Sequence, residues 1–249
     1  MNSYRWLAYY QNNRMNRPEP KWNSPSPLDR GKQWILARSL SHFQLGETGD
    51  GKFLIAHARA QTPEDAAYHE ALQLLVAEEN EHARLLERLV GRFGGKTIRR
   101  HWTHMLFRSV RHALGFKFEI QALVTAELVG TAYYRLLHRY TRDAVLEEAC
   151  ALILKDEARH VDFHAEWFGD FQSRLLPVQC AMWKTQFQML FATAVQVAWV
   201  DHRRCLRALG ATRAEFLREA FRECIRFLKQ LELKVNSASA EIPQGVVSL

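Results

Sequence analysis

Cysteine is scarce in this sequence of 249 residues: there are four, and no two of them form a C-x-x-C pair. A disulfide framework and a cysteine-rich zinc site are therefore excluded as organising features. All four cysteines lie in stretches with a helical pattern, so we expect reduced thiols in a cytoplasmic protein. They are Cys150, Cys180, Cys205 and Cys224.

Long apolar runs are also absent. The N-terminal residues contain no apolar segment that would indicate a signal peptide. The longest apolar stretch covers residues 187–200, but Gln188 and Gln196 interrupt it. At about 14 residues this stretch is too short to cross a bilayer. We therefore expect a buried helix there and no membrane span.

Sustained strand-like alternation is missing, whereas apolar residues recur at helical spacing in most of the chain. The sequence predicts an all-α fold, a four-helix bundle with two additional C-terminal helices. The first 28 residues contain Pro18, Pro20, Pro25 and Pro27, which predict an irregular N-terminal arm. We expect one helical domain over residues 29–234 and a loose C-terminal tail over residues 235–249.

Capping residues, prolines and glycines predict the helix boundaries. One helix is expected from Asp29 to about residue 60, although three glycines weaken it in the middle. Thr62 and Pro63 indicate the start of the next helix, which is expected to end at Gly94. The other four helices are expected at about 114–140, 143–168, 177–209 and 212–234.

The pattern Glu-x-x-His occurs twice, as Glu79 with His82 and as Glu157 with His160, each time inside a long helical stretch. Residues three apart lie on one helix face, so each pair can offer a carboxylate and an imidazole to one metal ion. Both pairs stand in stripes of otherwise mostly apolar residues. Two such pairs on facing helices predict a dinuclear carboxylate site.

Each pair has a further Glu about thirty residues upstream, Glu47 for the first and Glu127 for the second. Glu127 is the only charged residue in an otherwise apolar or neutral stripe, and burying an ionised carboxylate is costly unless it is paired or bound to metal. The glycines around Glu47 leave its helix face undefined, so Glu70 is the alternative to it. The predicted metal ligands are Glu47, Glu79, His82, Glu127, Glu157 and His160.

This set of donors predicts which metal the site would hold. Four carboxylates and two neutral imidazoles carry four negative charges, which two divalent ions would neutralise. Carboxylate and imidazole ligands suit iron or manganese. Zinc would favour fewer ligands in a tetrahedral arrangement.

The run Asp156-Glu157-Ala158-Arg159-His160 resembles the D-E-x-R-H signature of the ferritin-like carboxylate-bridged diiron proteins. It is similar in particular to their oxygen-activating branch, which includes multicomponent monooxygenases, the radical-generating subunit of ribonucleotide reductase, acyl-carrier-protein desaturases and arylamine N-oxygenases. The resemblance covers roughly residues 30–170. It implies two iron ions, with manganese as the alternative, and O2 as a cosubstrate.

In this family the acid that precedes each Glu ligand often accepts a hydrogen bond from the opposite His and so fixes its tautomer. By position, the resemblance implies that Asp156 holds His82 and that Glu78 holds His160. These two acids are therefore expected to lie just outside the ligands and to orient them.

Four further residues near the motifs have more than one interpretation. Glu81 stands where an Arg is common in the family, and it forms either a cross-helix ion pair with Arg159 or an exposed charge. His164 lies on the ligand face of its helix, as an extra metal ligand, a base, or a packed histidine. Tyr134, two turns after Glu127, is an oxidisable neighbour of the metals or an ordinary core residue.

Charge is unevenly distributed in a chain with a formal net charge of +7. The segment from Arg88 to Phe118 has eight basic residues and no acid, and either faces water or attracts an anionic partner or substrate. The eight are Arg88, Arg92, Lys96, Arg99, Arg100, Arg108, Arg111 and Lys117.

The leading functional hypothesis is a dinuclear iron oxygenase that activates O2 to hydroxylate, N-oxygenate or desaturate a small organic substrate. No flavin, haem or iron–sulfur motif is present, so electrons would come from an external donor, such as a reductase or ferredoxin, or from the substrate. The alternatives are a manganese catalase or peroxidase and an iron-handling ferritin-like protein.

A tRNA-modifying hydroxylase is less favoured, because few aromatic residues accompany the basic segment, and we expect no nucleic-acid partner. A helical scaffold without enzymatic activity would leave the paired Glu and His residues unexplained. A homodimer is compatible with the sequence, which does not specify the oligomeric state.

Overall fold

The computed structural model describes residues 1–105 and 115–241. Every regular secondary-structure element in these residues is an α-helix. This confirms the all-α prediction for the described residues. The helices are α1 (Ser3–Met15), α2 (Arg30–Glu47), α3 (Lys52–Gln61), α4 (Ala66–Arg92), α6 (Phe116–Tyr140), α7 (Ala144–Gln172), α8 (Pro177–Leu209) and α9 (Arg213–Glu241).

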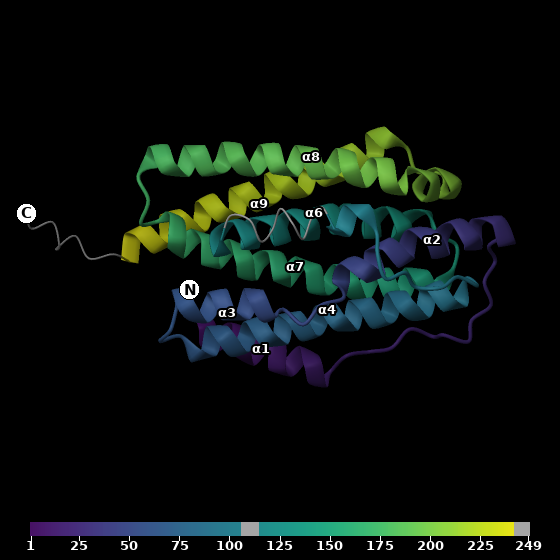
Figure 1. The fold of residues 1–249 in the computed structure, drawn as a ribbon, viewed down its shortest axis with the longest axis horizontal. Coiled ribbons are helices and arrows are strands. Elements are labelled where there is room, and N and C mark those ends of the chain that lie inside the picture. Colours follow the sequence, from purple (N-terminus) through teal and green to yellow (C-terminus); the bar gives the residue numbers. More distant parts are fainter. Residues whose placement is uncertain (106–114, 242–249) are drawn as a thin grey trace, which may run out of the picture.

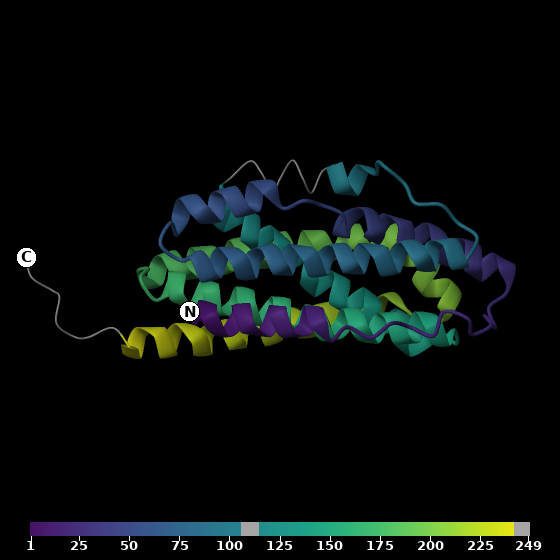
Figure 2. The same cartoon turned by 90° about the horizontal axis from the view of Figure 1, so that it is seen from below.

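The long helices run side by side along the longest axis of the molecule (Figure 1). Helix α2 packs against α4, α6 packs against α7, and α4 also contacts α7, so these four helices enclose a common interior. Helix α8 covers α2 and α6, whereas α9 covers α6 and α7. On the other side, α1 lies along α4 (Figures 1 and 2).

The N-terminal arm is not irregular throughout, because residues 3–15 form helix α1. The side chain of Asn2 caps its first turn by accepting a hydrogen bond from the Arg5 amide, 3.0 Å away. Trp6 and Tyr10 are buried, and both rings pack edge-on against Phe163 of α7. The polar composition of α1 concealed this buried face, which is why the prolines alone gave the wrong expectation.

The helix expected from residue 29 to 60 is interrupted, and α2 ends at Glu47 before α3 begins at Lys52. Gly51 has φ of +59°, in the left-handed region that favours glycine. A Cβ atom at Gly51 would lie 2.7 Å from Cγ2 of Val76 on α4. The glycine therefore permits both the break in the chain and the close approach to α4.

Two other predicted boundaries also differ from the structure. Helix α4 is capped by Asp65, which accepts a hydrogen bond from the Tyr68 amide, whereas Thr62 bonds back to the carbonyl of Ala58 and closes α3. Helix α7 continues past Gly169 to Gln172. A Cβ atom at Gly169 would lie 2.5 Å from Cβ of Lys234, so this glycine marks a close helix crossing and not a helix end.

The C-terminal tail was predicted to be loose from residue 235, but α9 extends to Glu241. The rest of that prediction, residues 242–249, lies outside the described residues. Among the helices described, none has the length and apolarity that crossing a membrane requires, α8 included.

Candidate metal centre

The six predicted ligands come from α2, α4, α6 and α7, the four helices that enclose the interior. They form two overlapping groups. Glu47, Glu79, His82 and Glu157 each place a donor atom within 4.8 Å of those of the other three. Glu79, Glu127 and His160 form the second group by the same measure. Glu79 belongs to both, so the groups are adjacent. This arrangement offers two neighbouring metal positions, although metal binding itself stays a prediction.

Both histidines direct Nδ1 toward the carboxylates. Nδ1 of His160 lies 2.7 Å from Oε1 of Glu79, and Nδ1 of His82 lies 3.6 Å from Oε1 of Glu157. Two ligand atoms that are each about 2.1 Å from one ion, at a right angle, lie about 3 Å apart. The observed separations are close to that spacing.

The other ring nitrogen of each histidine faces an acid on the opposite helix. Nε2 of His82 lies 3.1 Å from Oδ2 of Asp156, and Nε2 of His160 lies 3.0 Å from Oε2 of Glu78. Both contacts implied by the family resemblance are therefore present. A proton on each Nε2 leaves the Nδ1 lone pair directed inward, as a metal ligand requires.

Helix α1 and the residues after it support these two acids. The sequence did not predict this support. The side-chain amide of Asn13 donates to Oε1 of Glu78 at 2.7 Å and to Oδ1 of Asp156 at 2.9 Å. Arg17 donates to Oδ2 of Asp156 at 2.5 Å. Burial acts to raise the pKa of Asp156, but the contact to His82 and these interactions with Arg17 and Asn13 outweigh burial and lower the pKa to about 2. Asp156 is therefore ionised and can hold the proton of His82 in place.

The carboxylates of the cluster do not all ionise readily without a cation. Burial, followed by the charge of Glu79, raises the pKa of Glu47 and of Glu157 well above the usual range. Burial acts in the same direction on Glu79, but His160 and His82 outweigh it and lower its pKa. Burial acts to lower the pKa of His160, and the neighbouring acids raise it well above its usual range. Protons thus provide the positive charge that metal ions would otherwise supply.

Unsatisfied polar atoms test whether the residues fit such ions. Five atoms of the cluster are buried and have no hydrogen-bond partner in the structure: Oε1 of Glu79, Nδ1 of His82, Oε2 of Glu127, Oε2 of Glu157 and Nδ1 of His160. The short contact from His160 to Glu79 has the distance of an ion pair without the direction of a hydrogen bond. Buried polar atoms normally have partners, so this convergence is what bound cations would satisfy.

His164 lies beside Glu127. It is fully buried, and its Nε2 is 3.1 Å from Oε1 of Glu127, while its Nδ1 has no partner. Neither metal-competent group includes His164. Its observed contact is thus with a predicted ligand, as a residue that orients Glu127.

Tyr134 and Glu47 also lie together. The Tyr134 hydroxyl donates to Oε1 of Glu47 at 2.8 Å, so this tyrosine contacts a predicted ligand from the core of α6. The alternative ligand Glu70 is on the surface of α4, where Gln11 donates to it. Between the two candidates, the structure brings Glu47 and not Glu70 to the cluster.

The cross-helix ion pair considered for Glu81 and Arg159 is not formed. Glu81 accepts from Arg84 on its own helix at 2.7 Å. Arg159 pairs with Asp162 on α7 at 3.2 Å, and its guanidinium lies above the ring of Tyr9. Each charge is satisfied locally because residues three apart on one helix are neighbours.

A cavity of about 600 Å³ opens beside the carboxylates. Glu47, Glu79, Glu127 and Glu157 line one part of it, whereas neither ligand histidine does. Apolar side chains of α6 and α8 form much of the remaining wall, among them Leu123, Leu190 and Val197. The histidines are thus sealed inside the bundle, and the carboxylates face a space large enough for an organic molecule.

Part of the basic segment has a structural role. Arg88 pairs with Glu19 at 3.1 Å and stacks on Trp22, and Arg92 pairs with Asp143 at 3.0 Å. Arg92 also donates to the carbonyl oxygens of Trp22 and Ser24, so both arginines hold the connection between α1 and α2 in place. Lys96, Arg99 and Arg100 are exposed, whereas Arg108 and Arg111 lie outside the described residues.

No family model, no curated protein and no solved structure matches this chain. The interpretation of the site therefore depends on its own residues and their geometry.

Proposed function

We propose that this chain is a ferritin-like diiron protein that uses O2 to oxidise a small organic substrate. The observation that carries the proposal is the orientation of His82 and His160. Each is held by an acid from the facing helix and directs its free nitrogen into the cluster, whose carboxylates come from α2, α4, α6 and α7. Two iron ions bound there would supply the reduction of O2.

The residues of the chain would bind and orient these ions. Glu79 is common to both groups and would contribute to both positions, whereas Glu47 and Glu127 would each contribute to one. Asp156 and Glu78 keep the protons on Nε2 of the histidines, so that both rings remain in the ligand tautomer. The hydroxyl of Tyr134 donates a hydrogen bond to Oε1 of Glu47 and would orient this carboxyl group.

The cavity supports an organic substrate over hydrogen peroxide alone. A catalase needs space only for a molecule about the size of two waters, but the space here is about 600 Å³. Its largely apolar wall would exclude water and favour an apolar or aromatic body in the substrate. Hydroxylation, N-oxygenation and desaturation all remain within the proposal, with electrons from an external donor or from the substrate.

Metal loading and oxygen uptake test this function directly. Purified protein loaded with Fe(II) without oxygen should bind two irons at the cluster, consume O2, and change its near-ultraviolet and visible absorption on oxidation. Glu79→Gln with Glu157→Gln should abolish these changes, whereas Glu70→Gln, on the surface of the same helix as Glu79, should not. Rapid dismutation of hydrogen peroxide by manganese-loaded protein, with no O2 consumption by the iron form, would refute the proposal in favour of a catalase.

A further inference from the structure

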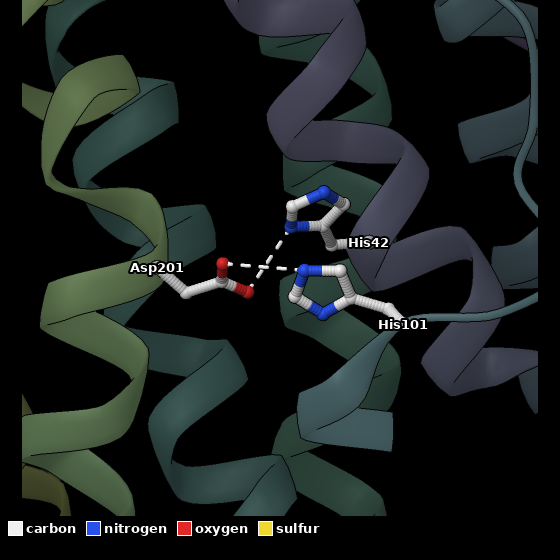
Figure 3. Close-up of side chains that lie close together, drawn as sticks. All are labelled: His42, His101 and Asp201. Carbon is white, nitrogen blue, oxygen red and sulfur yellow. Dashed lines mark hydrogen bonds and ion pairs between the residues drawn. The ribbon is translucent and has the colours of Figure 1, made fainter. Parts of the chain in front are cut away.

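A second cluster of metal-ligating side chains lies on the same cavity, separate from the carboxylates. His42 of α2, His101 of the segment after α4, and Asp201 of α8 place one donor atom each within 4.8 Å of the others. Figure 3 shows both imidazoles on one side of the Asp201 carboxylate. Nδ1 of His42 is 3.0 Å from Oδ2 of Asp201, and Nε2 of His101 is 3.6 Å from Oδ1.

The arrangement is held from several sides. The rings of His42 and His101 are stacked, with centroids 3.8 Å apart, so the two imidazoles share a common orientation. Nδ1 of His101 lies 2.6 Å from the Thr103 hydroxyl, which fixes the ring with Nε2 toward the carboxylate. A partner on the second nitrogen is the usual support for a metal-binding histidine.

Neighbouring His202 completes the surroundings of Asp201. Its Nε2 lies 3.6 Å from Oδ2 of Asp201, and its Nδ1 is 2.8 Å from the hydroxyl of Ser39, which also contacts Tyr133.

We propose that His42, His101 and Asp201 form a site for a single divalent transition-metal ion, distinct from the dinuclear cluster. Two imidazoles and one carboxylate are a donor set typical of iron(II) and of zinc when further coordination positions are left open. The side chains are 10–17% exposed. His42 and Asp201 line the cavity, so the open positions of the ion face the space that also borders Glu47 and Glu79.

The competing account is a cluster held only by hydrogen bonds to Asp201. The two accounts differ in what His101 contributes. In a hydrogen-bonded cluster, His101 adds a long contact of 3.6 Å to Asp201 and its stacking on His42, so its removal leaves metal binding to the protein unchanged. In a metal site it is one of three protein ligands, and its removal weakens binding strongly.

Cobalt(II) binding to full-length protein separates these accounts. In the variant Glu79→Gln with Glu157→Gln, which disables the dinuclear cluster, one Co2+ per chain should remain bound and absorb in the visible region. Adding His101→Ala should raise the dissociation constant for Co2+ by more than about 100-fold, and so should Asp201→Asn, which keeps the shape of the side chain. Loss of a residue that only orients a ligand would cost about 10- to 100-fold. His138→Ala, which removes a half-buried histidine of α6 outside both clusters, is the matched control.

Metal content by mass spectrometry after equilibration with Zn2+ provides the second measurement. The otherwise unaltered chain should bind one more ion than its Asp201→Asn variant, and circular dichroism should show that both are folded. Equal metal content and equal cobalt affinity with and without His101 and Asp201 would overturn the proposal. This result is distinct from failure of the dinuclear site, which would instead leave metal content unaffected by Glu79→Gln with Glu157→Gln.

Discussion

Asp156 of α7 holds His82 of α4 across the bundle, with 3.1 Å between Oδ2 and Nε2, while the opposite nitrogen of the ring faces the carboxylate cluster. The mirror relationship joins Glu78 of α4 to His160 of α7. Each helix thus provides a predicted ligand and also the acid that orients the ligand on the other helix.

Replacing Asp156 by Asn should weaken metal binding without removing a ligand. The amide carries no charge to retain the proton on Nε2 of His82, and it also loses the ion pair with Arg17. We expect about 10- to 100-fold weaker binding of Fe(II) or Co(II), measured by competition with a chelator. Glu232→Gln on the exposed face of α9 is the control, and equal affinities in the two variants would refute this role for Asp156.

Replacing His164 should affect the metal site through Glu127. His164→Ala removes the contact to Oε1 of Glu127 and leaves a space in the core, so we expect weaker metal binding and a lower free energy of unfolding by about 1–3 kcal/mol. His164→Gln keeps a donor and should recover part of the affinity. If metal content and oxygen reactivity are unchanged in the Ala variant, His164 is only a packed histidine.

The raised pKa of Glu157 predicts how the stability of metal-free protein depends on pH. A carboxyl group that binds its proton more tightly in the folded state loses stabilisation as pH rises from its ordinary pKa through the raised one. Glu157→Gln is permanently neutral, so without metal it should be more stable than the natural chain at pH 7. The difference in free energy of unfolding between this variant and the natural chain should shrink toward pH 5, by at most about 1.4 kcal/mol per pH unit.

Denaturant unfolding with a chelator present, at pH 5, 6 and 7, measures this difference. His202, whose low pKa gives the opposite dependence on pH, is present in both proteins and cancels. An unchanged difference across the three pH values would show that Glu157 is ionised without metal. With metal bound, the order should reverse, because the Gln variant lacks a ligand.

The exposed part of the basic segment should act on an anionic partner. Charge reversal by Arg99→Glu with Arg100→Glu should slow reduction of the iron by an acidic electron-transfer protein and reduce the salt dependence of the rate. Iron content should not change, because neither residue contacts the cluster. Lys229→Glu on α9 is the control, and equal rates in both variants would identify the segment as a solvated connection.

Helical periodicity sufficed to predict α4, α6 and α7, on which the predicted ligands Glu79, Glu127 and Glu157 stand in otherwise mostly apolar stripes. It did not predict α1, whose few buried residues are spread over a polar sequence. The break after Glu47 depends on the close contact of Gly51 with Val76, and such contacts are invisible before the helices are packed.

The residues around the site were harder to predict than the ligands. Asn13 and Arg17 approach Asp156 from more than a hundred residues away and follow no local pattern. His42, His101 and Asp201 likewise come from three distant segments. Spacing along one helix predicts shared faces, whereas such groups depend on tertiary packing alone.

The amide of Asn13 donates to Glu78 and Asp156 together, so one side chain of the N-terminal helix joins the supports of both histidines. Binding of ions at the proposed site and attachment of α1 would then be linked equilibria. Any event that detaches the first seventeen residues would lower the affinity for the ions, and bound ions would in return stabilise the attachment of α1 by the same free energy. Protection of α1 from proteases would thus report whether the interior of the bundle is loaded.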